Sequence, residues 1–215
     1  ELPIERQGAR NDLTDLYDMI KSGLTNDEII AENQAFIFNL DKIDKARQTV
    51  LESEYRKKIR DIKVQYIFGK TGTGKTSGIF EKHGFDKVYR VTDYTHPFDG
   101  YSQQPVIVFE EFRSSLKISD MLNYLDIYPL ALPCRYSNKI ACFEIVYIVS
   151  NIELEYQYSD IQIHSAETWQ AFLRRINNGV LHYLDDGKIV QYSSVAEYLS
   201  VGKVPFYFTK IGKNT

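Results

Sequence analysis

The sequence predicts an α/β fold in which a parallel sheet follows a helical subdomain. Three short runs are rich in β-branched and aromatic residues, at 63–68, 106–109 and 145–149. The middle run is apolar throughout, which is typical of a strand that is buried on both faces. Because helical patterns separate these runs, we expect the strands to lie parallel in one layer.

The first sixty residues have the pattern of three helices. Asn11 and Asp12 can cap a helix that runs to Ile20, and Gly23 lies just past its end. Asn26 can cap a second, short helix. A third helix is predicted because apolar residues recur at the spacing of one helical face: Leu40, Ile43, Ala46, Val50 and Leu51.

The chain beyond the third predicted strand has a helix and two strand candidates. An amphipathic helix follows Gln162, with four apolar residues on one face: Trp169, Phe172, Leu173 and Ile176. Short β-rich runs at 189–192 and 205–208 are candidates for the last strands.

The composition excludes several classes of protein. Hydrophobic residues make up 43% of the 215 residues and charged residues 26%, so the chain can bury a core and is not a disordered tail. The net charge of -3 excludes a uniformly basic surface, so any contact with a polyanion is expected to be local. No apolar run approaches the ~20 residues that a membrane span needs, and we expect no membrane partner.

The cysteine content and the first residue bear on location and on completeness. Two cysteines are too few for a secreted disulfide framework, which favours free thiols and a cytoplasmic location. No charged-then-apolar signal peptide opens the chain. The first residue is Glu1 rather than Met, so we expect an excised or processed piece of a longer protein.

A glycine-rich loop follows the first predicted strand, and residues 77–82 can open a helix after it. Its eight residues fit the phosphate-binding pattern G-x-x-x-x-G-K-[ST]: Gly69, Lys70, Thr71, Gly72, Thr73, Gly74, Lys75 and Thr76. The glycines let backbone N–H groups curl around phosphate oxygens at a helix N-terminus. Lys75 is expected to reach the β- and γ-phosphates of ATP, and the Thr76 hydroxyl to ligate Mg²⁺. The alternative is a glycine-rich turn that matches by chance.

Polar residues end the second and third predicted strands. The run 106–109 leads directly into Glu110 and Glu111. We expect Glu110 to hold Mg²⁺ through water and Glu111 to accept a proton from the attacking water. Asn151 follows the third strand, where a neutral amide can hydrogen-bond both the γ-phosphate and the water. The alternatives are a solvated acidic turn for the two acids and an ordinary turn residue for Asn151.

Two arginines lie on the predicted amphipathic helix. Arg174 and Arg175 both point away from its apolar face, and helical geometry does not separate them. One of them is a candidate arginine finger for the nucleotide of a neighbouring subunit, an effect worth ~10³ to 10⁵ in rate. The alternative is a solvated basic face of the helix.

A predicted hairpin lies between Glu111 and Asn151. Ser137 and Asn138 form its turn, between two β-like arms within residues 128–141. Near the tip the sequence has cations and an aromatic ring but no acid, as a contact with single-stranded nucleic acid requires: Arg135, Tyr136 and Lys139. An ordinary surface hairpin is the alternative.

Taken together, these motifs resemble the superfamily 3 helicases. More closely, the chain resembles the helicase part of replication initiator (Rep) proteins of circular single-stranded DNA viruses and related bacterial plasmids. The stretches that carry the resemblance cover most of the chain up to about residue 176: 8–13, 69–76, 99–101, 106–112, 126–130, 148–151 and 173–176.

The resemblance implies an AAA+-like P-loop ATPase that forms a hexameric ring, threads single-stranded DNA and binds ATP between subunits. By position it assigns the phosphate loop to Lys75 and Thr76, the acids to Glu110 and Glu111, the sensor to Asn151, the finger to Arg174 or Arg175, and the pore hairpin to Arg135, Tyr136 and Lys139. It implies three parts: a helical oligomerisation collar at 1–60, the ATPase core with its hairpin at 61–160, and the finger helix with C-terminal strands at 161–215. For a virus of eukaryotes, it also allows the host nucleus.

The sequence departs from such initiators in one respect. They carry an upstream nicking domain with two histidines flanking an apolar residue and a catalytic tyrosine, and none of the 4 histidines here forms that pair. Nicking is therefore not predicted. Two rival functions remain: an RNA-virus-type superfamily 3 ATPase acting on RNA, and a module that uses ATP only to organise an assembly on nucleic acid.

Overall fold

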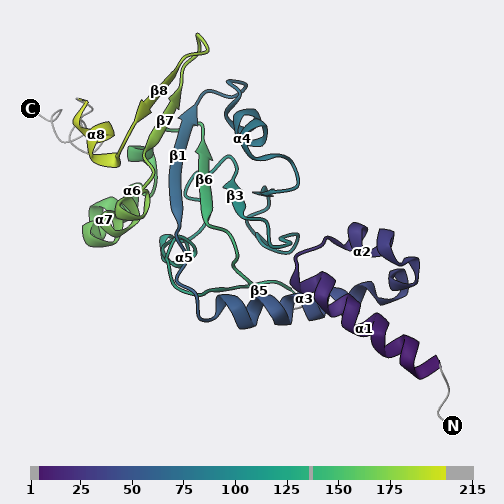
Figure 1. Cartoon of the computed structure of the whole chain (residues 1–215). Coiled ribbons are helices and arrows are strands. Elements are labelled where there is room, and N and C mark those ends of the chain that lie inside the picture. The colour runs from purple at the N-terminus through teal and green to yellow at the C-terminus, as the bar shows by residue number, and fades with distance from the viewer. Residues whose placement is uncertain (1–4, 136–137, 202–215) are drawn as a thin grey trace, which may run out of the picture. The chain divides into compact units, whose positions relative to one another are not determined.

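A computed structural model describes residues 5–135 and 138–201 (Figure 1). The chain divides into two compact units, Glu1–Lys58 and Ile59–Thr215. The division lies two residues before the end of the expected helical collar. In the described part of the chain, no helix is long and apolar enough to cross a membrane.

The first unit contains three α-helices and a 3-10 helix. They are α1 (Glu5–Lys21), α2 (Asn26–Glu32), η1 (Gln34–Asn39) and α3 (Leu40–Tyr55). Their small core is apolar and consists of Ile20, Ile29, Phe36 and Ile43. Two cap predictions were wrong. Helix α1 starts at Glu5, so Asn11 and Asp12 lie inside it. Thr25, rather than Asn26, caps α2, because it forms a capping box with Glu28.

The second unit is built on a six-stranded sheet. In spatial order its strands are β2 (Val88–Val91), β3 (Val106–Phe109), β6 (Ile145–Ser150), β1 (Lys63–Gly69), β7 (Val180–Tyr183) and β8 (Ile189–Tyr192). Every neighbouring pair is parallel except β7 and β8. The central register pairs Ile67 with Val149 and Phe109 with Ile148, so the carboxyl ends of β1, β3 and β6 reach the same edge.

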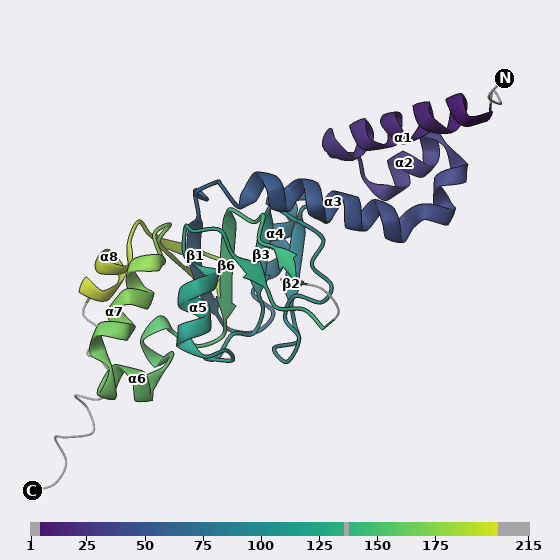
Figure 2. The ribbon, with the colours of Figure 1, turned by 90° about the horizontal axis from the view of Figure 1, so that it is seen from below.

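Helices cover both faces of this sheet (Figures 1 and 2). Helix α4 (Lys75–His83) packs on one face through Ile79, against the β-strand residues Ile67, Val108 and Val149. The other face carries the larger core, to which α5 (Ile118–Tyr124), α7 (Ala166–Arg175) and α8 (Val195–Ser200) contribute. The remaining short elements are η2 (Leu154–Tyr156), α6 (Ser159–His164), β4 (Ala131–Leu132) and β5 (Lys139–Ile140).

The predicted fold class is confirmed: the chain has an α/β fold with a mostly parallel sheet, and the glycine-rich loop joins its strand β1 to helix α4. The runs at 63–68, 106–109, 145–149 and 189–192 are strands. Strands β2 and β7 were not predicted. Unlike β3, which is equally short but apolar throughout, each includes a charged or titratable residue, Arg90 or His182. The run at 205–208 lies outside the described residues. Both cysteines are free, as expected.

Candidate nucleotide-binding site

The glycine-rich loop joins β1 to α4, as its pattern predicts. Gly72 and Gly74 have φ values of 83° and 84°, a left-handed conformation that favours glycine. A side chain at Gly69 would clash with the backbone carbonyl of Tyr183 on β7. On the same side of the loop, Lys70 forms an ion pair with Asp185, which lies in the β7–β8 turn. Strand β7 and its turn therefore fix one wall of the loop.

Lys75, the first residue of α4, points back across the loop. Its Nζ donates hydrogen bonds to the carbonyl oxygens of Gly69 at 2.8 Å and Lys70 at 2.7 Å. The residue is only 6% exposed. Burial lowers the pKa of its ammonium group, and the nearby carboxylates of Glu111 and Glu110 oppose that shift. The loop carbonyls thus hold the ammonium where phosphates are expected to bind.

Thr76 and Glu110, the two predicted metal residues, are in contact. The Thr76 hydroxyl donates to Glu110 Oε2 at 3.0 Å. Glu110 is buried at the end of β3, and its other oxygen, Oε1, accepts a hydrogen bond from Arg90 Nε at 3.0 Å. Arg90 lies on β2 and was not predicted, since strand β2 itself was not recognised. Arg90 supplies a positive charge beside the Glu110 carboxylate, which is almost fully buried.

The donor set at this point fits Mg²⁺. A hydroxyl and a carboxylate are hard oxygen ligands, and Mg²⁺ typically takes one or two protein ligands, several waters and the phosphates of its nucleotide. Among the residues that the structure describes, no cluster of three or more acids, histidines or cysteines offers a fuller cage. Thr76 and Glu110 would therefore hold the metal together with ATP, rather than bind it alone.

Glu111 and Asn151 lie at the same edge of the sheet. Glu111 is exposed, with a left-handed φ of 49°, and its charge acts on the Lys75 ammonium. Asn151 directly follows β6, the neighbour of both β1 and β3. Its Oδ1 accepts a hydrogen bond from Arg113 Nε at 2.9 Å. Arg113 was not predicted either, although it lies only two residues beyond Glu111.

The two candidate finger arginines differ in the structure. Arg175 forms an ion pair with Asp126 at 2.6 Å and is partly buried. Arg174 is exposed, and across the described ranges its side chain makes no hydrogen bond or ion pair. The two residues, which the helical pattern left equivalent, are therefore distinguished by the position of Asp126.

The predicted hairpin consists of β4 and β5, which are antiparallel. The sequence of the hairpin has no acid near its tip, but the fold brings Asp99 to it from a distant segment. Arg135 forms an ion pair with Asp99, and Lys139 Nζ donates to the carbonyl oxygens of Asp99 at 2.8 Å and Tyr101 at 2.7 Å. Tyr136, the third predicted contact, lies outside the described residues. Both described cations therefore have partners within the chain.

Comparisons with known proteins match this part of the chain. A family model described as RNA helicase matches residues 65–152, which include the loop, both acids and Asn151. A replication-associated protein of human associated cyclovirus 1 is 29% identical over 79% of this chain and 61% of its own length. The chain is similar in sequence to viral replication-associated proteins. The resemblance inferred from its motifs is thus confirmed.

Other replication-associated proteins show the same relationship. Those of goose circovirus and canary circovirus are 26% and 27% identical, over 69% and 80% of this chain. The match covers 49% and 56% of their own lengths, so the chain spans about half the length of these replication-associated proteins. Among solved structures, the S. cerevisiae Hsp104-ADP complex is similar at a TM-score of 0.40 and 18% identity, over 66% of this chain and 27% of that one.

Proposed function

We propose that the chain is an ATP-driven ring helicase or translocase. It acts on single-stranded DNA in the replication of a circular DNA replicon, and it hydrolyses ATP between subunits. The observation that carries the ATPase proposal is the 3.0 Å contact between the Thr76 hydroxyl and the Glu110 carboxylate beside the buried Lys75. The replicative role is supported by the relatives, each of which is named a replication-associated protein.

The described residues have separate roles in this proposal. The loop amides and Lys75 bind the β- and γ-phosphates, and Thr76 and Glu110 hold Mg²⁺, which neutralises phosphate charge when it is bound. Glu111 takes the proton of the water that attacks the γ-phosphorus as the bond to the ADP oxygen breaks. Asn151 contacts the γ-phosphate.

Turnover and particle mass test this function together. ATP hydrolysis is measured alone, with a single-stranded DNA oligonucleotide and with an RNA of the same sequence, and mass is recorded with and without ATP. Stimulation by DNA, together with a ring-sized particle, supports the proposal. Stimulation by RNA alone favours the RNA-directed ATPase. Nucleotide binding and assembly without turnover favour the scaffold, and a monomer at full turnover contradicts a site between subunits.

We propose Arg174, rather than Arg175, as the residue that reaches a neighbouring subunit's nucleotide, because Asp126 already engages Arg175. Mixing the Arg174→Ala variant with wild-type chain is expected to reduce hydrolysis below the level of simple dilution, since one altered subunit disables the site next to it. Titrating the variant into the wild type at constant total protein measures this effect.

The matched control for that mixture is Arg175→Ala. Loss of its partly buried ion pair with Asp126 is expected to cost about 1–3 kcal/mol of stability, seen as a lower Tm. Strictly proportional activity in the Arg174→Ala mixtures would refute action between subunits.

The hairpin cations are expected to contact DNA phosphates. Replacing Arg135 and Lys139 by alanine is expected to weaken single-strand affinity and to reduce the slope of log affinity against log salt by about one to two units. Binding titrations at several salt concentrations measure this slope. Lys188→Ala is the matched control, since Lys188 pairs with Asp186 in the β7–β8 turn. Because Lys139 also holds two backbone carbonyls, Arg135→Ala is measured alone as well. An unchanged slope would show that the hairpin does not bind DNA.

A further inference from the structure

Arg113 and Asn151 form a pair at the carboxyl edge of the sheet. Arg113 follows β3, Asn151 follows β6, and the two strands are neighbours in the sheet. The Arg113 Nε donates to Asn151 Oδ1 at 2.9 Å. Arg113 is exposed and Asn151 half-buried, so the contact lies at the surface of this edge.

The chemistry of arginine fixes which end of the Asn151 amide it binds. A guanidinium group only donates hydrogen bonds, so the side-chain oxygen of Asn151 must face Arg113. The amide nitrogen then remains with two donors, and no described residue accepts a hydrogen bond from it. The free side of the Asn151 amide is therefore its NH₂ group, which can donate a hydrogen bond to a phosphate oxygen.

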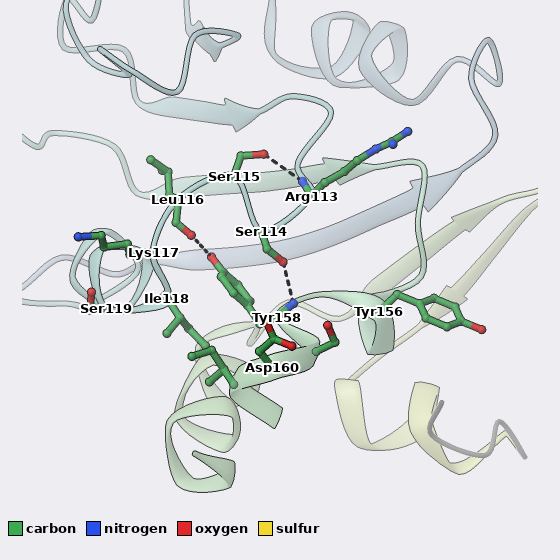
Figure 3. Close-up of a pocket in the computed structure, with 12 residues that line it drawn as sticks. Arg113, Ser114, Ser115, Leu116, Lys117, Ile118, Ser119, Tyr156, Tyr158 and Asp160 are labelled. Atoms are coloured by element: carbon green, nitrogen blue, oxygen red, sulfur yellow. Dashed lines mark hydrogen bonds between the residues drawn. The ribbon is translucent and has the colours of Figure 1, made fainter. Parts of the chain in front are cut away.

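The loop that carries Arg113 is hydrogen-bonded to β6. Phe112 N donates to the Val149 carbonyl at 2.9 Å, and Ser150 Oγ donates to the Phe112 carbonyl at 2.7 Å. Beyond Arg113, the backbone N–H of Tyr158 donates to Ser114 Oγ at 2.7 Å (Figure 3).

The backbone of this loop also adopts an unfavourable conformation next to Arg113. Glu111 and Ser114 have φ values of 49° and 54°, which non-glycine residues rarely adopt. The surrounding bonds thus maintain a conformation that the loop alone would avoid. Arg113, Tyr158 and Asp160 line one pocket, and Figure 3 shows the Arg113 side chain pointing away from the other two.

We propose that Arg113 is a positioning residue for Asn151: it binds the amide oxygen and so directs the amide nitrogen toward the γ-phosphate of ATP. The proposal rests on the proposed ATPase function and deepens it. It assigns Asn151 to the phosphate, as a donor, and leaves the attacking water to Glu111. Arg113 itself makes no contact with the nucleotide in this account.

A double-mutant cycle tests the proposal with Arg113→Ala, Asn151→Ala and the double variant. The first readout is the ratio of ATPγS affinity to ADP affinity, which needs no turnover. Arg113→Ala is expected to lower this ratio about 5- to 10-fold while ADP affinity stays unchanged, because only the γ-phosphate contact is weakened. In the Asn151→Ala background, the Arg113 replacement is expected to have no further effect.

Two further variants sharpen the result. Asn151→Asp keeps an oxygen for Arg113 but has no donor for phosphate, so its loss is expected to equal or exceed that of Asn151→Ala. Lys117→Ala, which removes an exposed cation four residues away, is the control and should change nothing. Near-normal ATPγS preference in Asn151→Asp would overturn the donor assignment. Additive losses in the double variant would show that Arg113 acts independently of Asn151.

Failure of the proposed function gives a different pattern. If the chain shows the expected affinity ratios but never hydrolyses ATP, the ATPase proposal fails and the positioning role stands. If hydrolysis is normal and the losses are additive, the positioning role alone is wrong. If the affinity ratio never exceeds one in the wild type, no γ-phosphate contact exists and the positioning role is excluded.

Discussion

Replacing Lys75 by alanine is expected to abolish tight binding of ATP. Lys75 is only 6% exposed, and the carbonyl oxygens of Gly69 and Lys70 hold its ammonium group where phosphates are expected to lie. Losing two charge-assisted hydrogen bonds to phosphate costs about 3 kcal/mol or more, so ATP affinity should fall at least about 10²-fold. Titration with a fluorescent ATP analogue measures the loss.

Lys70→Ala is the matched control for this variant. Lys70 lies in the same loop, but its side chain is exposed and pairs with Asp185. We expect its removal to change ATP affinity by no more than a few-fold, because exposed ion pairs contribute little. Equal affinities in the two variants, with unchanged Tm, would refute the assignment of the phosphate loop.

Glu111→Gln is expected to bind ATP normally and to hydrolyse it about 10² to 10⁴ times more slowly. An amide of the same size cannot accept the proton of the attacking water. Because Glu111 is exposed, we expect the variant to keep the wild-type fold. Single-turnover hydrolysis measures the chemical step, and the mass with ATP reports whether assembly survives. Wild-type turnover would place the general base elsewhere.

The adjacent acid provides the comparison for this second variant. Glu110→Gln keeps the side-chain volume but removes the negative charge beside Thr76, which makes the side chain a weaker ligand for Mg²⁺. It is expected to reduce the Mg²⁺ dependence of ATP affinity, whereas Glu111→Gln leaves that dependence unchanged. If both variants behave alike, the division of labour between the two acids is wrong.

The features predicted from sequence are those that are encoded locally. The glycine-rich loop is recognisable because strand, glycines, lysine and helix are contiguous in the chain. Buried parallel strands are recognisable because both faces demand apolar residues, as at 106–109. Alignment of their carboxyl ends then brings Glu110 and Asn151 to one edge without further information.

The features that were missed depend on contacts between distant segments. Arg90 faces Glu110 only because β2 pairs with β3, and Asp99 reaches Arg135 across 36 residues. Arg113 has no motif of its own, and its partner lies 38 residues away. Nothing in the local sequence signals such pairings, because they arise from the order of the strands.

The ion pair that engages Arg175 has a consequence for the start of the second unit, Ile59–Thr215. The carboxylate of Asp126 holds Arg175, and its backbone carbonyl accepts a hydrogen bond from Arg60 at 2.6 Å. Arg60 is 1% exposed and lies second in this unit, and its Nε and Nη1 have no hydrogen-bond partner among the described residues. Asp126 thus links Arg60, at the start of the second unit, to Arg175, at the end of helix α7. Displacing Asp126 would break its ion pair with Arg175 and its hydrogen bond with Arg60 at the same time.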